Sequence, residues 1–276
     1  MRVVKNMAIK MVAIDIDGTL VDNHKVIGKK TIEVIKEARK QGVYIVLCTG
    51  RPLSGVKEYL EQLELVSTND YAITFNGAKA EITATNEAVF ENLLEASQVK
   101  KLDELSHKLN IKGQVVLADS KVITTFRDIS PYTVVDAFYT KMPLFYREPK
   151  EIKDAKTAKY MWVDEPAVIQ EKLAVAADYF NGLYTVLSAP WFYEFMNPKA
   201  HKGAAVIELG EYLGIKREEI MCLGDENNDL TMFEEVGFGV AMGNANEQIK
   251  RLAKAVTTDN EHDGVGVAIE KYVLQK

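Results

Sequence analysis

Short apolar runs alternate with amphipathic stretches over the first 75 residues of the chain. Met11–Ile16, Val43–Cys48 and Tyr71–Phe75 have the length and composition of buried strands. After the first run, apolar residues recur at helical spacing until Gly42, where a helix can end. Pro52 marks the start of a second helix before the third run. This β-α-β-α-β order predicts a doubly wound α/β fold, a parallel sheet with helices on both faces.

The same alternation returns near the C-terminus, whereas the middle of the chain has a different pattern. Residues 84–190 combine two helical stretches with scattered strand-like runs, and the regular alternation is lost there. We therefore predict a Rossmann-like core domain made of residues 1–83 and 191–276. Residues 84–190 are expected to form a separate α+β unit inserted between its two halves.

The segment Asp15-Ile16-Asp17-Gly18-Thr19-Leu20 lies at the carboxyl end of the first predicted strand, the edge where open α/β sheets bind ligands. Side chains two residues apart on a strand point the same way, so Asp15 and Asp17 can face one site. Two carboxylates about 4 Å apart repel by roughly 4 kcal/mol at an effective dielectric near 20, and a cation would offset that cost. Mg²⁺ prefers such oxygen ligands. A calcium loop is disfavoured because an apolar strand precedes the motif and Val26 occupies the twelfth position.

Three further segments carry groups suited to phosphate and metal binding. Cys48-Thr49-Gly50-Arg51 offers a hydroxyl, a glycine amide and a helix N-terminus to an anion, although such a turn can be purely structural. Gly224–Asp229 brings a second oxygen-rich cluster to the same sheet edge. Lys202 begins a predicted helix, where the dipole disfavours a cation unless an anion is bound nearby. Lys199 is the rival candidate, and a solvated surface lysine is the ordinary alternative.

These four segments occur in a characteristic order. D-x-D-G-T-L at 15–20, T-G-R at 49–51, K-G at 202–203 and G-D-x-x-N-D at 224–229 resemble the four motifs of the haloacid dehalogenase superfamily. The large insert after the turn signal Asn76-Gly77 resembles that of Cof-type members. Arg127-Asp128-Ile129-Ser130 and Asp164-Glu165-Pro166-Ala167 resemble segments of YidA-type sugar phosphatases. The resemblance covers nearly the whole chain after Met7.

The resemblance implies a role for each motif. Asp15 would be the nucleophile that becomes phosphorylated, and Asp17 the acid that protonates the leaving alkoxide and then deprotonates water. The ligands of a Mg²⁺ cofactor would come from Asp15, the Asp17 carbonyl, Asp225, Asn228 and Asp229, the last two completing or orienting the set. The phosphoryl oxygens would be bound by Thr49, the Gly50 amide, Lys202 and Asn228. Arg51 would either reach the substrate or form a structural ion pair.

The implied activity is a magnesium-dependent phosphatase acting on a small phosphorylated metabolite, in particular a sugar phosphate. Asp17 favours a phosphatase over a dehalogenase, which needs the nucleophile alone. His201, beside Lys202, is not needed as an acid because Asp17 fills that role. The insert resembles a cap that closes over the site and selects the leaving group. Two alternatives stay open: a sugar phosphomutase or phosphotransferase, and a non-catalytic regulator that binds a phosphorylated ligand.

Composition bears on partners and location. The chain has 40 acidic and 34 basic side chains, a formal net charge of −6, which disfavours nucleic acid and anionic membranes as partners. It carries neither a signal-peptide pattern nor an apolar run of about 18 residues, so a cytoplasmic protein is expected, monomeric or homodimeric. Met1 and Met7 are both candidate start residues. Cys48 and Cys222 are expected to be free thiols, on strands that the resemblance places on opposite sides of the Asp15 strand.

Overall fold

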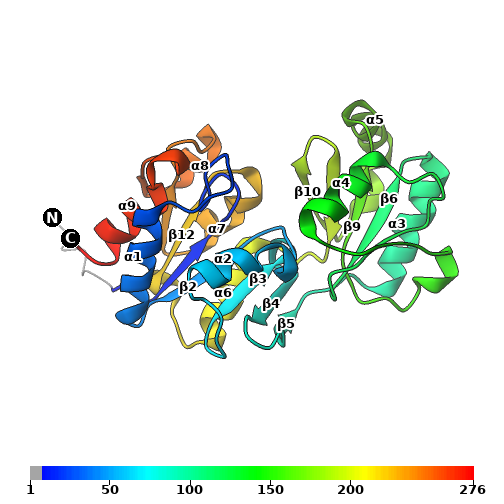
Figure 1. Cartoon of the computed structure of the whole chain (residues 1–276). Coiled ribbons are helices and arrows are strands. Elements are labelled where there is room, and N and C mark those ends of the chain that lie inside the picture. Colours follow the sequence, from blue (N-terminus) through cyan, green and yellow to red (C-terminus); the bar gives the residue numbers. More distant parts are fainter. Residues whose placement is uncertain (1–7) are drawn as a thin grey trace.

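The computed structural model describes residues 8–276, so the two candidate start residues Met1 and Met7 lie outside the described residues. The described chain forms two units side by side, each built on its own sheet (Figure 1). We call them the core unit (residues 8–91 and 202–276) and the insert unit (residues 96–196). No helix in residues 8–276 is long and apolar enough to cross a membrane.

The core unit contains an eight-stranded sheet. In spatial order its strands are β14 (Ala255–Val256), β13 (Phe238–Ala241), β12 (Ile220–Gly224), β1 (Met11–Ile14), β2 (Tyr44–Cys48), β3 (Tyr71–Thr74), β4 (Lys79–Ile82) and β5 (Ala88–Glu91). Neighbours from β14 to β3 pair in parallel, which confirms the predicted doubly wound α/β fold. The antiparallel strands β4 and β5 extend it beyond the prediction. Strand β4 has no continuous apolar run, because the buried ion pair Lys79–Glu81 alternates with its apolar residues.

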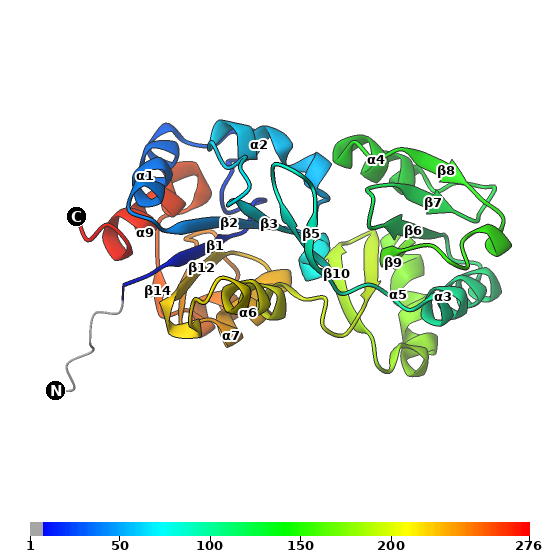
Figure 2. The same cartoon turned by 90° about the horizontal axis from the view of Figure 1, so that it is seen from below.

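Helices cover both faces of the core sheet. They are α1 (Lys29–Lys40), α2 (Lys57–Gln62), α6 (Lys202–Tyr212), α7 (Leu230–Glu235), α8 (Glu247–Leu252) and α9 (Gly264–Tyr272). Figure 2 shows α1, α2 and α9 on one side of the sheet and α6 and α7 on the other. Short 3-10 turns lie at Leu53–Gly55, Phe75–Gly77, Arg217–Glu219, Asn227–Asp229 and Asn260–His262.

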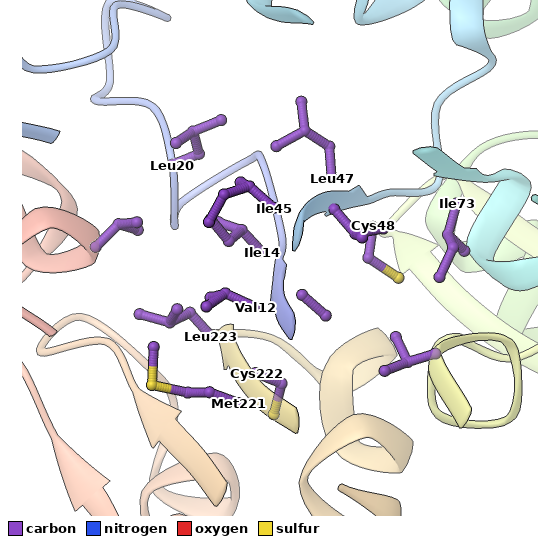
Figure 3. Close-up of a cluster of buried hydrophobic side chains, with 14 of the residues drawn as sticks. Val12, Ile14, Leu20, Ile45, Leu47, Cys48, Ile73, Met221, Cys222 and Leu223 are labelled. Carbon is purple, nitrogen blue, oxygen red and sulfur yellow. The ribbon is translucent and has the colours of Figure 1, made fainter. Parts of the chain in front are cut away.

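The hydrophobic core of this unit is centred on β1, whose four residues are all buried. Val12 and Ile14 pack in one cluster with side chains of β2 and β12, the strands on either side (Figure 3). Each fully buried aliphatic side chain contributes roughly 1.5–3 kcal/mol. Cys48 and Cys222 are both buried free thiols on these flanking strands, which confirms the prediction that they form no disulfide.

The insert unit contains a six-stranded, largely antiparallel sheet. In spatial order its strands are β10 (Tyr184–Ala189), β11 (Phe192–Met196), β9 (Thr157–Val163), β6 (Gly113–Leu117), β7 (Val122–Thr124) and β8 (Leu144–Tyr146). Its helices are α3 (Ala96–Leu109), α4 (Pro131–Thr140) and α5 (Pro166–Ala176), with 3-10 turns at Pro149–Glu151 and Ala177–Phe180. In Figure 2, α3 and α5 lie on one side of this sheet and α4 on the other. Helix α4 was not predicted, although Ser130 and Pro131 are typical of a helix start, and its apolar residues Val134, Val135, Phe138 and Tyr139 are exposed in the structure.

The strand pairing corrects the predicted boundaries at residues 83/84 and 190/191. Strand β5 pairs with β4 of the core sheet, and β11 pairs with β9 and β10 of the insert sheet. The chain therefore changes sheets between Glu91 and Ala96 and again between Met196 and Lys202. Composition alone could not locate these points, since only the hydrogen-bonded partners of β5 and β11 show which sheet each strand joins. The two crossings contact each other, because the Asn197 amide donates to the Leu93 carbonyl at 2.8 Å.

Candidate active site

The four predicted motifs meet at one edge of the core sheet. Asp15 follows β1, Thr49 follows β2 and Asp225 follows β12, three adjacent parallel strands whose carboxyl ends share that edge. Lys202 is the first residue of α6 and its side chain reaches the same place. The convergence on which the sequence interpretation depends is therefore present in the structure.

A buried cluster of carboxylates forms the centre of the site. Asp15, Asp225 and Asp229 each place an oxygen within 4.8 Å of the others. Burial and the Asp229 charge raise the pKa of Asp15 well above its usual range. Burial and the same neighbour raise the pKa of Asp225 to about 7. Three acidic groups buried this close together therefore require positive charge nearby.

Lys202 supplies part of that charge. Its ammonium is fully buried and donates to Oδ1 of Asp15 and Oδ1 of Asp229, both at 2.6 Å. Burial alone would lower the pKa of Lys202, but the two carboxylates raise it, so the side chain stays cationic. Lys199, the rival candidate, is exposed.

The remaining oxygens fit a divalent cation. Asp229 is already occupied, since its Oδ2 accepts the backbone N–H groups of Asp225 and Glu226. Among the described residues, Oδ1 of Asp225 accepts one hydrogen bond and its Oδ2 accepts none, so Oδ2 is open to a cation. Within the same residues Oδ1 of Asp15 accepts from Lys202 alone and keeps a lone pair for that cation, which leaves Oδ2 of Asp15 unbonded. Hard carboxylate oxygens with local negative excess are what Mg²⁺ requires. The donor set therefore fits the expected metal, with Asp229 orienting Lys202 and the 225–226 backbone.

Thr19 and Gly18 shape the candidate metal position beside Asp225, and the sequence interpretation gave neither residue a role. The Thr19 hydroxyl donates to Asp225 Oδ1 at 2.8 Å and so orients that carboxylate. Gly18 has φ +82°, and a Cβ there would lie 2.3 Å from Asp225 Oδ2. Both residues belong to the first motif, so their position within it was the available signal.

The Asp17 carboxylate lies outside the acidic cluster and is held by two cations. Arg51 donates to both of its oxygens, at 2.8 and 2.6 Å, and Lys25 donates at 2.7 Å. Burial would raise the pKa of Asp17, but hydrogen bonds from Arg51 and Lys25 lower it, so the group is ionised in this arrangement. Of the two roles open to Arg51, the structure shows the ion pair.

The predicted phosphate-binding groups surround an unpredicted residue, Asn76. Asn76 has φ 57° and is buried, and its Oδ1 accepts from the Asn228 amide at 3.3 Å. Gly50 packs against it, since a Cβ on Gly50 would approach Asn76 Oδ1 to 3.0 Å. On its other side the Asn76 amide donates to Glu194 of the insert unit at 2.9 Å. The Asn-Gly turn signal therefore marked a junction between the site and the insert.

His201 has a structural role. Its Nδ1 accepts the Ala204 backbone N–H, which caps the N-terminus of α6. The cap ties His201, the residue before Lys202, to the helix that carries Lys202.

A cavity of about 330 Å³ opens above the carboxylates, between the two units. Its core side includes Asp15, Asp17, Thr49, Gly50, Arg51, Asn76 and Asn228. Its insert side includes Asp136, Thr140, Met142, Lys159, Met161, Ser188, Phe192 and Glu194. The cavity can hold a small molecule with one end at Asp15 and the other against the insert.

A family model described as haloacid dehalogenase-like hydrolase matches residues 12–269. The chain belongs to this family. The expected membership of the superfamily and of its Cof-type hydrolases is thereby confirmed.

Two relatives from Bacillus subtilis match this chain over almost their whole length. The chain is 40% identical over 270 residues to the Bacillus subtilis protein named "Putative phosphatase YxeH", covering 97% of this chain and 99% of the relative. It is 32% identical over 271 residues to the 5-amino-6-(5-phospho-D-ribitylamino)uracil phosphatase YcsE of the same organism, covering 98% of each. A solved haloacid dehalogenase-like hydrolase from Bacteroides thetaiotaomicron has a TM-score of 0.83 at 29% identity, covering 95% of this chain and 99% of that one. These names support a phosphatase of this family.

Proposed function

We propose that the protein is a Mg²⁺-dependent phosphatase that hydrolyses small phosphorylated metabolites, sugar phosphates in particular, through a phosphorylated Asp15. The observation that carries the proposal is the position of Asp15, which lies beside a buried ammonium and a second carboxylate and lines the cavity between the two units. A nucleophile, a phosphate-binding cation and a metal position within one small volume are the parts that phosphoryl transfer needs.

Asp15 carries the covalent step. Its unbonded oxygen attacks phosphorus, forming an O–P bond as the bond from phosphorus to the leaving oxygen breaks. Lys202 keeps the other Asp15 oxygen in place and lies close enough to offset charge on the phosphoryl group. Thr49 and the Gly50 amide bind phosphoryl oxygens at the opposite rim. When bound, Mg²⁺ would neutralise the carboxylates and the phosphoryl oxygens together.

Asp17 serves the leaving group and then water. Loss of its contacts with Arg51 and Lys25 would raise the pKa of Asp17, so that it takes up a proton from solvent and delivers it to the leaving oxygen. It then takes a proton from the water that attacks phosphorus. Release of inorganic phosphate then restores Asp15. A substrate that enters the cavity between the two units would displace Arg51 from Asp17, since Arg51 also lines this cavity.

The substrate class rests on the size and polarity of the cavity. About 330 Å³ suits a phosphate and a leaving group of sugar size. The relative YcsE is named for a substrate whose phosphate is on a ribityl chain, which is a polyol, and this supports a polyhydroxylated leaving group. We infer that the insert unit is the specificity domain, with the core unit holding the phosphoryl group.

The test measures inorganic phosphate released from acetyl phosphate and from a panel of sugar monophosphates, with and without Mg²⁺. Asp15→Asn should abolish release, whereas Asp128→Asn, an exposed insert carboxylate outside the cavity, should retain it. Asp17→Asn should slow sugar phosphates far more than acetyl phosphate, whose leaving group needs no proton. Turnover retained in Asp15→Asn, or phosphate passed only to added sugar, would contradict the proposal.

A further inference from the structure

The insert side of the cavity carries charged side chains. Successive side chains of β9 point to opposite faces of the insert sheet. Tyr160 and Trp162 pack under α3 and α5, whereas Lys159 and Met161 face the cavity. Asp136 of α4 and Glu194 of β11 line the same wall. Two carboxylates and one ammonium therefore face the position where a leaving group would lie.

Glu194 is fully engaged by its neighbours. Its Oε1 accepts from the Lys159 ammonium and from the Ser188 hydroxyl, both at 2.7 Å. Its Oε2 accepts from the Asn76 amide at 2.9 Å. Glu194 thus fixes the position of Lys159 and connects the wall to the loop of the phosphate site.

Asp136 and Lys159 keep hydrogen-bonding capacity for a ligand. Asp136 Oδ2 accepts from the Gln114 amide at 2.8 Å, and no described residue donates to its Oδ1. Lys159 has three N–H donors, and Glu194 accepts the single hydrogen bond that the described residues receive from it. One acceptor and at least one donor are therefore left on adjacent groups that line the cavity.

Packing does not explain these charges. The side chains of Lys159 and Glu194 are only 8% and 3% exposed, and apolar residues of similar volume often stabilise a protein at least as well as such a pair. Met142, Met161 and Phe192 line the same wall, so apolar side chains fit there. Charged groups kept at such a desolvation cost point to recognition.

We propose that Asp136 and Lys159 form the subsite that recognises the leaving group, and that this subsite selects polyhydroxylated groups and rejects those with a second anion. The inference rests on the proposed phosphatase function. Asp136 accepts from one hydroxyl and Lys159 donates to another, while Met161 and Phe192 contact the carbon skeleton. With Asp136 and Glu194 against one lysine, the wall has a net charge of −1, so a second phosphate or a carboxylate would meet repulsion.

The test compares ratios of kcat/KM. The probes are acetyl phosphate, whose leaving group is too short to reach the wall, the sugar monophosphates turned over by the unmodified protein, and fructose 1,6-bisphosphate. Asp136→Ala should lower the ratio of sugar monophosphate to acetyl phosphate at least tenfold. Asp136→Asn should raise the turnover of the bisphosphate relative to the monophosphates at least fivefold, a gain that structural damage would not give. The exposed insert variant Asp128→Asn should keep both ratios within twofold.

The outcomes separate the two proposals. If the unmodified protein hydrolyses acetyl phosphate and sugar monophosphates but neither ratio changes in the Asp136 variants, the subsite is refuted and the phosphatase stands. If the unmodified protein hydrolyses none of the probes, the proposed function fails and the subsite with it. Should Asp136→Ala fail to fold, Asp136→Asn, which keeps the side-chain volume, decides through the bisphosphate ratio.

Discussion

The buried pair Lys159–Glu194 should be important for the stability of the insert unit only while Glu194 is charged. Replacing Lys159 by Met keeps the volume and leaves the Glu194 carboxylate with the Ser188 and Asn76 donors alone. Removing one partner of a buried pair typically costs about 3–5 kcal/mol. Protonating a glutamate at pH 7 costs about 3.7 kcal/mol, which limits the loss. We therefore expect Lys159→Met to lower the free energy of unfolding by about 2–4 kcal/mol at pH 7.

The loss should depend on pH in one direction. Without Lys159, the folded protein takes up a proton at this position more readily than the unfolded chain, so stability falls as pH rises above about 4. At pH 5 the limit set by protonation is only about 1 kcal/mol. Urea unfolding followed by tryptophan fluorescence measures this unit directly, because Trp162 lies in β9 and Trp191 directly precedes β11.

A double-mutant cycle provides the control. Lys159→Met combined with Glu194→Gln removes both charges and should lie within about 1 kcal/mol of the unmodified protein. A loss below 1 kcal/mol in Lys159→Met at pH 7, or a loss that is the same at pH 5, would refute the reasoning.

Three other residues or pairs give sharp expectations. Thr19→Val removes the hydroxyl that orients Asp225 and should weaken Mg²⁺ activation about 10–100-fold in a metal titration, while Thr19→Ser should not. His201→Ala should lower the free energy of unfolding by about 1 kcal/mol by removing the cap of α6, with Asn restoring it; an equal loss in both would contradict the capping role. Cys48 and Cys222 should react with a thiol reagent only after denaturation, and fast labelling of the native protein would argue against their burial.

The core sheet and the acidic centre of the site were accessible from the sequence because they depend on local rules. A buried parallel strand is a short apolar run, and a polar residue directly after it must lie at the carboxyl edge. Asp15, Thr49 and Asp225 follow three such strands. Lys202 could be separated from Lys199 only through the motif, since the two lie three residues apart near the start of the same apolar helix.

The junction between the two units was not accessible in the same way. Asn76 reads as a turn residue, and only the return of β11 beside it shows that its amide bridges Asn228 and Glu194. Asp136 lies on α4, where exposed apolar residues flank it in the sequence, so the hydrophobic pattern does not show that Asp136 faces the cavity. These roles depend on contacts between residues far apart in the sequence, and no periodicity in the chain records such contacts.

The insert is attached to the core through two adjacent crossings, joined by the bond from Asn197 to the Leu93 carbonyl. A covalent connection through two adjacent segments allows the insert to diverge in sequence, or to be exchanged for another unit, without changing the order of the core strands. Different substrates could thus be served by one unchanged set of reactive groups. For protein engineering, residues 96–196 form a replaceable module whose graft points are already close together in space.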